Sequence, residues 1–146
     1  MLAWRLCREP FADLSGEGAR LHGGRWNRRG RPLLYLAETA ALALLELRVH
    51  LDLPPELLPD DYVLATIDLD ALLTETVNDI PDSPAGFGDN WLTEQRTPVL
   101  RVPSVLVPES CNLLLNPLHP ASARARLVRT RRFTFDPRLW LPGGAV

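Results

Sequence analysis

The chain has 146 residues, of which 46 % are apolar and 23 % are charged, and its formal net charge is −2. These values are typical of one globular domain and exclude disordered, collagen-like and low-complexity proteins. The longest apolar run, residues 40–45, is too short to span a bilayer, and we find no secretory signal. Cys7 and Cys111 are too few for a disulfide or zinc framework. We therefore expect a single domain, residues 1–146, that resides in the cytoplasm without contacting a membrane.

All 16 basic residues are arginines. Chemistry that depends on lysine is therefore excluded, namely a Walker-type phosphate loop, a Schiff base and Ser–Lys hydrolysis. The charge is uneven: residues 1–31 hold seven Arg and three acids (+4), residues 32–95 one Arg and thirteen acids (−12), and residues 96–146 eight Arg and two acids (+6). An acidic middle between basic ends favours a small anionic ligand or a charged protein partner over nucleic acid.

The first half of the chain alternates short apolar runs with turn residues. In chain order it predicts a strand at 3–7, a loop at 15–24, a strand at 33–36 and a helix at 38–51. The helix is predicted from its alanine and leucine content, from Glu38 at its start and from the proline pair that follows it.

The second half predicts, in chain order, a strand at 62–69, a loop at 79–88, a helix at 89–96 and strands at 99–107 and 127–135. Pro103 interrupts one of these strands and indicates a sheet edge or a bulge. Because strands and helices do not alternate regularly, we expect a mixed α+β fold rather than a doubly wound sheet.

Residues 23–27, Gly-Gly-Arg-Trp-Asn, form the first candidate site. The glycines allow a sharp turn or a close approach to a ligand. Arg25, Trp26 and Asn27 offer a guanidinium for phosphate, a flat ring and a polar amide. The alternative interpretation is an ordinary turn with a buried tryptophan.

Glu46 is the second candidate, because almost every neighbour in the predicted helix is apolar. At helical spacing its carboxylate shares a face with Leu42, Ala43 and His50. A carboxylate on such a face is rarely buried without a partner. Glu46 is therefore either a tuned acid or charge stabiliser in a pocket, or a member of a structural ion pair, or a residue at the domain edge.

Four other polar residues are candidates, of which Tyr35 and Ser104 lie in predicted strands. Tyr35 precedes the helix, where a tyrosine usually belongs to the core with its hydroxyl bonded. Ser104 follows a proline kink and is placed to point into a cleft, but it lacks the Gly-x-Ser-x-Gly pattern of a nucleophile elbow. Asn112 and Asn116 flank three leucines, and Asn116 begins a turn. The three histidines lack metal-ligand spacing, so we expect no metal site.

Taken in chain order, these pieces resemble the RES domain family, which is named after an Arg, a Glu and a Ser. The matching stretches are residues 23–27, Gly30, 34–37, 43–46, 88–89, Trp91, 102–105, 112–117, His119, Pro120 and 133–139. The resemblance covers nearly the whole chain except residues 52–84, for which we infer nothing from the family.

The resemblance implies a toxin of a bacterial type II toxin–antitoxin pair whose partner is an Xre-like antitoxin with a helix-turn-helix domain. It implies an α+β fold similar to ADP-ribosyltransferases, with a mixed, mostly antiparallel β core and flanking helices. NAD⁺ is then the substrate, no cofactor is required, and the catalytic residues are Arg25, Tyr35, Glu46 and Ser104. The expected substrate-binding residues are Gly24, Trp26, Asn27, Asn112 and Asn116. We expect an oligomer with the antitoxin and no direct contact with nucleic acid.

The residue chemistry agrees with cleavage of the nicotinamide–ribose bond by hydrolysis or phosphorolysis, which would deplete NAD⁺ and arrest growth. Arg25 would bind a phosphate or ribose oxygen, and Tyr35 would contact the nicotinamide or its ribose. Glu46 would stabilise the positive ribose, and Ser104 would bond the ribose or the carboxamide. Two alternatives stay open: an ADP-ribosyltransferase that modifies a cellular protein, and a non-catalytic binding module.

Overall fold

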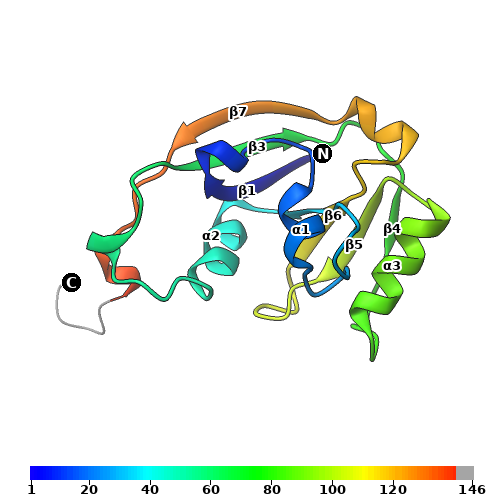
Figure 1. The fold of residues 1–146 in the computed structure, drawn as a ribbon, viewed down its shortest axis with the longest axis horizontal. Helices are drawn as coiled ribbons and strands as arrows, with labels where there is room; N and C mark the ends of the chain where they lie inside the picture. The colour runs from blue at the N-terminus through cyan, green and yellow to red at the C-terminus, as the bar shows by residue number, and fades with distance from the viewer. Residues whose placement is uncertain (141–146) are drawn as a thin grey trace.

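In the computed structural model, which describes residues 1–140, seven strands form one sheet in the order β4-β5-β6-β2-β1-β3-β7 (Figure 1). All neighbouring strands are antiparallel except β4 and β5, which are parallel. The strands are β1 (Leu2–Arg8), β2 (Leu34–Ala37), β3 (Tyr62–Asp68), β4 (Thr74–Thr76), β5 (Val99–Pro103), β6 (Cys111–Leu115) and β7 (Arg126–Arg132).

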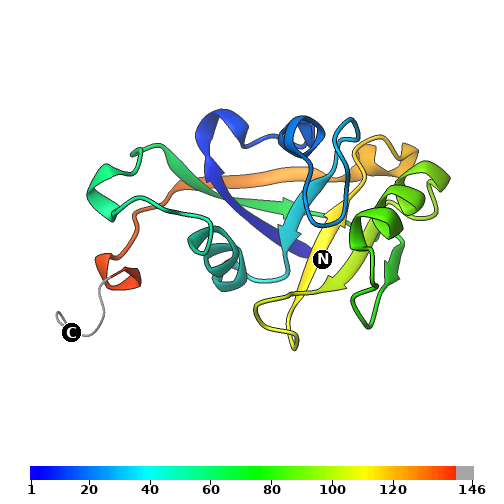
Figure 2. The same ribbon diagram turned by 60° about the horizontal axis from the view of Figure 1, so that its bottom comes forward.

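The helices of the described chain are short. They are α1 (Glu17–His22), α2 (Ala40–Arg48) and α3 (Pro84–Glu94), with 3-10 turns at Glu9–Phe11, Pro55–Leu57, Pro120–Arg124 and Pro137–Leu139. Helix α2 lies against β1 and β2, whereas α3 lies toward the β4–β5 end of the sheet (Figures 1 and 2). The expected α+β class with a mostly antiparallel sheet and flanking helices is confirmed.

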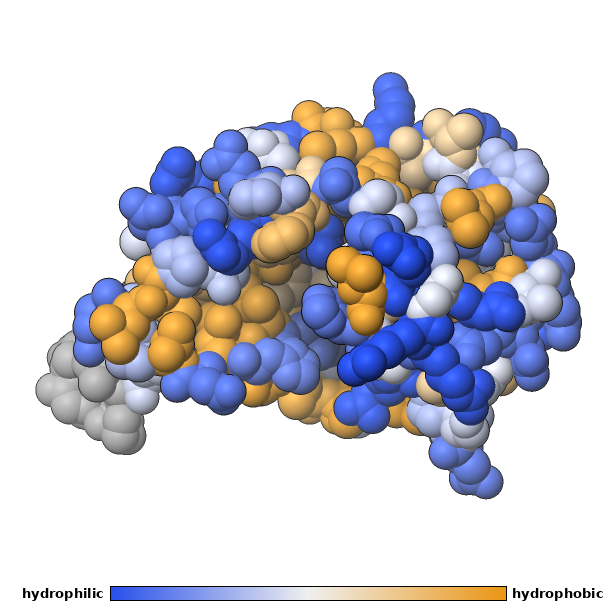
Figure 3. All heavy atoms as spheres, viewed as in Figure 1, coloured by the Kyte–Doolittle hydropathy of each residue, from blue (hydrophilic) through white to orange (hydrophobic). Residues whose placement is uncertain are grey.

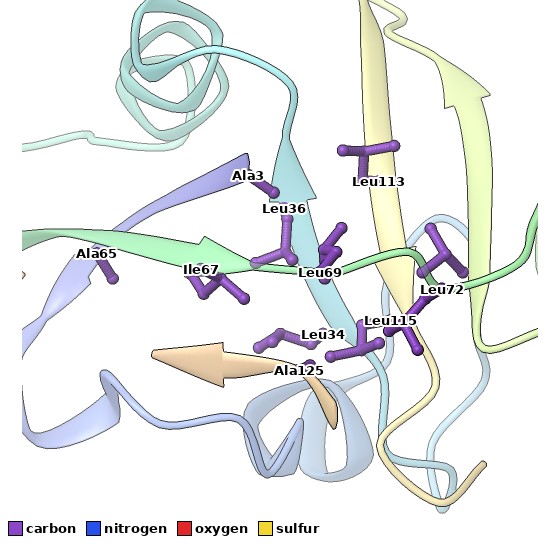
Figure 4. Packing of buried hydrophobic residues seen from close by; sticks show 11 residues of the cluster. Ala3, Leu34, Leu36, Ala65, Ile67, Leu69, Leu72, Leu113, Leu115 and Ala125 are labelled. Atoms are coloured by element: carbon purple, nitrogen blue, oxygen red, sulfur yellow. The ribbon is translucent and has the colours of Figure 1, made fainter. Parts of the chain in front are cut away.

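The middle of the sheet is buried on both faces, as β6 shows. Successive side chains of a strand point to opposite faces, and Leu113, Leu114 and Leu115 are all buried. Leu114 packs with Trp26 and Trp91, which come from the loop before β2 and from α3. Leu113 and Leu115 join the cluster drawn in Figure 4, whose members are Ala3, Leu34, Leu36, Ala65, Ile67, Leu69, Leu72, Val99, Leu113, Leu115 and Ala125.

Four expected strands are confirmed, since β1, β2, β3 and β7 match the predicted ranges to within a few residues. The expected strand at 99–107 is too long, because β5 ends at Pro103. Pro103 lies beyond the last residue pair of β4 and β5. Its lack of an N–H therefore removes no hydrogen bond between these two strands. The hydroxyl of Ser104 then accepts bonds from the amides of Leu106 and Val107, both at 3.2 Å, which turns the chain.

The expected loop at 15–24 is wrong, because its middle forms α1. Gly16 begins this helix in the left-handed conformation, with φ of 69°. One turn later Arg20 forms an ion pair with Glu17, and its amide bonds the carbonyl of Gly16 at 3.2 Å. Two glycines and several polar residues concealed this six-residue helix in the sequence.

The expected helix at 89–96 and loop at 79–88 are also misplaced, because α3 begins at Pro84. Ser83 caps the helix by accepting a bond from the Gly86 amide at 3.2 Å, and proline suits the first helical position. Gly88 is required where α3 meets the loop before β2, since a Cβ there would lie 1.8 Å from the Trp26 carbonyl oxygen.

The expected helix at 38–51 is confirmed as α2 but is shorter. Thr39 caps α2 by accepting a bond from the Leu42 amide at 3.1 Å. Glu38 therefore lies outside the helix, where its carboxylate pairs with Arg101 at 3.1 Å and accepts a bond from the Cys111 amide at 2.9 Å. These bonds fix the start of α2 to β5 and β6.

The expected domain at 1–146 includes residues 141–146, which lie outside the described part of the chain. Within residues 1–140, every helix is too short or too polar to cross a membrane.

Candidate active site

A cleft of about 600 Å³ opens between α1 and α2, beside β1 and β2. Figure 3 shows the hollow, with apolar side chains gathered on its α2 side. Its volume lies within the range of about 300–1,000 Å³ that is common for small-molecule sites. The titratable and amide side chains that line it are those of Arg5, Arg25, Tyr35, Glu46, His50 and Asn112.

The loop that contains Arg25 is held rigidly. Gly24 and Asn27 exchange backbone bonds of 3.0 and 3.4 Å, which closes a tight turn around Arg25. Trp26 is 3 % exposed and meets Phe87 edge to face, with ring centroids 6.1 Å apart. The Arg28 guanidinium and amide both bond the Asp89 carboxylate of α3, at 3.0 and 3.1 Å. The exposed Arg25 side chain therefore extends from a fixed turn.

The Tyr35 hydroxyl is bonded on the inner side of this loop. It accepts a bond from the Trp26 amide at 2.8 Å and donates to Asn27 Oδ1 at 2.7 Å. Burial raises the pKa of Tyr35 to about 12, so its hydroxyl stays neutral near pH 7. Gly24 leaves no space beside it, since a Cβ there would lie 2.6 Å from the hydroxyl oxygen.

Asn27 links this hydroxyl to the rest of the loop. Its side chain is 1 % exposed, and Nδ2 donates to the carbonyl of Ala19 at 2.9 Å and to those of Arg28 and Arg31, both at 3.1 Å. Buried amides are normally bonded in this way, and here the bonds use the amide fully.

Glu46 enters the cleft from α2 and is bonded by Ser104 from the loop after β5. The Ser104 hydroxyl donates to Glu46 Oε1 at 2.7 Å, and Ser104 itself is 0 % exposed. Glu46 Oε2 accepts no hydrogen bond from any other residue of the described chain. No arginine or histidine of residues 1–140 pairs with Glu46, so the interpretation as a structural ion pair is not supported.

Comparison with known proteins shows the family of this chain. Residues 2–136 match the model described as RES domain. The chain belongs to the RES domain family. It is 41 % identical to Prs ADP-ribosylating toxin of Sphingobium sp. (strain YBL2), over 93 % of this chain and 94 % of that protein. It is 33 % identical to Toxin Res of Pseudomonas putida (strain KT2440), over 96 % of this chain and 100 % of that protein.

A solved structure resembles this RES domain. The crystal structure of the M. tuberculosis MbcT–MbcA toxin–antitoxin complex contains a chain that matches with a TM-score of 0.72. The sequence identity is 24 %, and the match covers 94 % of this chain and 85 % of that chain. At this identity the likeness establishes the fold alone.

The RES domain brings six of the nine expected site residues to the cleft: Gly24, Arg25, Trp26, Tyr35, Glu46 and Asn112. Ser104 and Asn27 lie behind its surface and bond Glu46 and Tyr35. Asn116 lies elsewhere, beside a second cavity, where its Oδ1 accepts a bond from the Leu118 amide at 3.0 Å. The loop at residues 23–27 buries its tryptophan, as the interpretation as an ordinary turn expects, and exposes its arginine.

Two cleft residues of the RES domain were not expected from the sequence. Arg5 lies in β1 and donates to the carbonyl of Phe11 at 2.6 Å. A single arginine in a short strand gives no sequence signal for a cleft. His50 also lines the cleft, four residues after Glu46. The helical spacing placed it on the Glu46 face, but a lone histidine is usually structural.

Proposed function

We propose that the chain is the toxin of a bacterial toxin–antitoxin pair that cleaves the nicotinamide–ribose bond of cytoplasmic NAD⁺ and so arrests growth. The observation that supports this best is the Glu46 carboxylate, bonded by Ser104 at 2.7 Å and lining the same cleft as Arg25 and Tyr35. Membership of the RES domain family and the names of its curated relatives agree with a toxin.

The charges of the cleft suit NAD⁺, which has an anionic pyrophosphate and a flat cationic ring. Within residues 1–140 neither Arg5 nor Arg25 forms an ion pair with a carboxylate, so both positive charges are available to the two phosphates. The Tyr35 hydroxyl is bonded and neutral, so we assign Tyr35 a role in packing against the nicotinamide side through its ring.

Glu46 would act as cleavage develops. When the bond between ribose C1′ and nicotinamide breaks, its electron pair passes to the ring nitrogen, and neutral nicotinamide leaves without needing a proton. The ribose gains positive charge, which the carboxylate stabilises more strongly among apolar neighbours than in water. An oxygen of water or phosphate then bonds C1′. Water loses one proton to the solvent and gives ADP-ribose, and phosphate gives phosphorylated ADP-ribose.

Ser104 and Asn27 are positioning residues in this proposal. The Ser104 hydroxyl already donates a hydrogen bond to Glu46 and accepts hydrogen bonds from two backbone amides. It therefore has no further hydrogen bond to offer a ribose or carboxamide. It would orient Glu46 instead. Asn27 would do the same for Tyr35, since its amide is fully bonded within the loop.

We assign the partner to the Xre-like class with a helix-turn-helix domain, which would bind DNA on behalf of the complex. The solved toxin–antitoxin complex with the same fold supports an antitoxin as partner. An antitoxin that covers the cleft would keep NAD⁺ out. Expression without the partner should therefore arrest growth.

The test is NAD⁺ loss with the purified chain, in buffers with and without phosphate, with products separated by chromatography. We expect release of nicotinamide, and a phosphate requirement would identify a phosphorylase. Glu46→Gln should abolish turnover with an unchanged circular dichroism spectrum, because the amide keeps the size but loses the charge. Glu56→Gln, which changes an exposed carboxylate outside the cleft, is the matched control. Full activity of Glu46→Gln would overturn the assignment.

A second candidate is transfer of ADP-ribose to a cellular protein. It is favoured by the name of the 41 % identical relative, Prs ADP-ribosylating toxin. Incubation of candidate proteins with NAD⁺ and the chain, followed by mass spectrometry, separates the candidates. A mass increase of one ADP-ribose on a protein would favour transfer, and free ADP-ribose alone would favour hydrolysis.

A further inference from the structure

A second cavity, of about 540 Å³, lies on the other side of the loop that contains Arg25. Its walls are the chain from Arg29 to Pro32, the end of α3, and the turn that follows β6. It shares no lining residue with the active-site cleft. The cavity is therefore a separate candidate site, large enough for a small molecule.

The charge of this cavity is positive. Arg29 and Arg31 line it, and no aspartate or glutamate does. Neither arginine pairs with a carboxylate of residues 1–140, whereas eight other arginines do. Two guanidinium groups without a carboxylate partner beside a concave wall are a typical setting for a phosphate group.

Asn116 adds a hydrogen-bond donor of fixed orientation to the same wall. Its side chain is 2 % exposed, and its orientation is fixed because Oδ1 accepts a bond from the Leu118 amide at 3.0 Å. Its backbone is fixed as well, by bonds to Pro98 at 2.9 Å and from the Ser122 hydroxyl at 2.6 Å. Nδ2 donates to no atom of the described chain, and Asn116 lines the cavity. Every buried side-chain nitrogen and oxygen of residues 1–140 has a partner, so the unpaired Nδ2 reaches the surface of the cavity, where it can donate to an acceptor oxygen.

We propose that this cavity binds the phosphate group of a small organic phosphate of nucleotide size. The phosphate oxygens would bond Arg29, Arg31 and Asn116 Nδ2. A tetrahedral oxyanion offers enough acceptors for three such donors, and a carboxylate offers fewer. Leu92 and Leu118 supply apolar wall for the organic portion of the ligand.

Binding here would reach the active site through Asn27. Its Nδ2 bonds the carbonyl of Arg31, in the wall of the second cavity, and its Oδ1 bonds the Tyr35 hydroxyl in the cleft. A ligand that holds Arg31 in place would therefore stiffen the support of Tyr35 and the tight turn around Arg25.

The test is isothermal titration of the purified chain with AMP, inorganic phosphate and adenosine at low salt. We expect AMP to bind, phosphate to compete with it, and adenosine to bind at least about tenfold more weakly, because a charge-assisted bond contributes that much or more. Equal binding of adenosine, or no binding of AMP, would overturn the proposal.

Variants locate the site. The double variant Arg29→Ser/Arg31→Ser should weaken AMP at least about tenfold. Asn116→Asp keeps the acceptor for the Leu118 amide and replaces the donor by a negative charge, so it should also weaken AMP binding at least about tenfold. An unchanged circular dichroism spectrum checks that the variant is folded. The matched control is Arg129→Ser/Arg131→Ser, which removes the same charge from the exposed strand β7.

Arg25→Ser separates this cavity from the cleft. If AMP binding is lost in Arg25→Ser and kept in Arg29→Ser/Arg31→Ser, the ligand sits in the active site and the proposal is wrong. This result does not depend on catalytic activity, so the proposal and the proposed function can fail independently. Hydrogen exchange gives a second readout, since AMP should slow exchange of the Trp26 amide that bonds Tyr35.

Discussion

Replacement of Gly88 by alanine tests how α3 fixes the loop of the active site. The added Cβ would lie 1.8 Å from the carbonyl oxygen of Trp26, and real contacts of this kind are at least 3.0 Å. The helix and the loop must therefore separate by about 1.2 Å. No side-chain rotation can avoid this contact, because the atom that is met belongs to the backbone.

The expected loss of stability follows from two opposing effects. Forced overpacking costs about 3 kcal/mol at the upper end of the usual range, and alanine in place of glycine inside a helix contributes about 1 kcal/mol of stability. We expect Gly88→Ala to lower the free energy of unfolding by about 2 kcal/mol. The same movement shifts Arg25. Because a displacement of about 1 Å in an active site can cost about a hundredfold in rate, kcat/KM for NAD⁺ should fall about a hundredfold.

Urea unfolding and NAD⁺ turnover are the two assays. Gly18→Ala is the matched control for stability, since it lies inside α1 and its Cβ would meet nothing within 4 Å. The control should gain about 0.5–1 kcal/mol from helix propensity. If Gly88→Ala is as stable as this control, α3 does not press on the Trp26 carbonyl and the reasoning fails.

Three other changes probe the site and its supports. Gly24→Ala places a Cβ 2.6 Å from the Tyr35 hydroxyl and should lower kcat for NAD⁺ cleavage about tenfold or more; unchanged kcat contradicts this. Because the pKa of Tyr35 is about 12 when folded and 10.0 when unfolded, stability should fall as pH rises from about 10 to about 12, and Tyr35→Phe should remove that slope in urea titrations. Thr39→Ala removes the α2 cap and should cost about 1 kcal/mol in urea unfolding.

The elements that the sequence predicted well are those with strong local signals. The alanine-rich stretch that forms α2 and the β-branched and aromatic residues of β3 have such signals. Helix α1 and the three-residue strand β4 do not, because α1 has only six residues and β4 is defined by its pairing with β5. Strand β6 was not predicted, because its segment was noted only for its two asparagines. The sheet shows that its three leucines lie in the core.

The candidate site was predictable in its residue types and not in its contacts. In the sequence, the motif at residues 23–27 pointed to Arg25, and the apolar neighbours of an acid pointed to Glu46. The bond between Ser104 and Glu46, and the use of Asn27 as a support for Tyr35, required knowledge of which segments meet. The same limit applied to Arg5, which reaches the cleft from β1 without any motif.

The bond between Ser104 and Glu46 joins residues that are 58 positions apart, and the Arg28–Asp89 pair spans 61. Contacts of such separation form late, because a long loop must close before they stabilise the chain. Recovery of NAD⁺ cleavage during refolding should therefore lag behind secondary structure. A chain still emerging from the ribosome lacks a working cleft until β5 and the residues after it have joined the sheet.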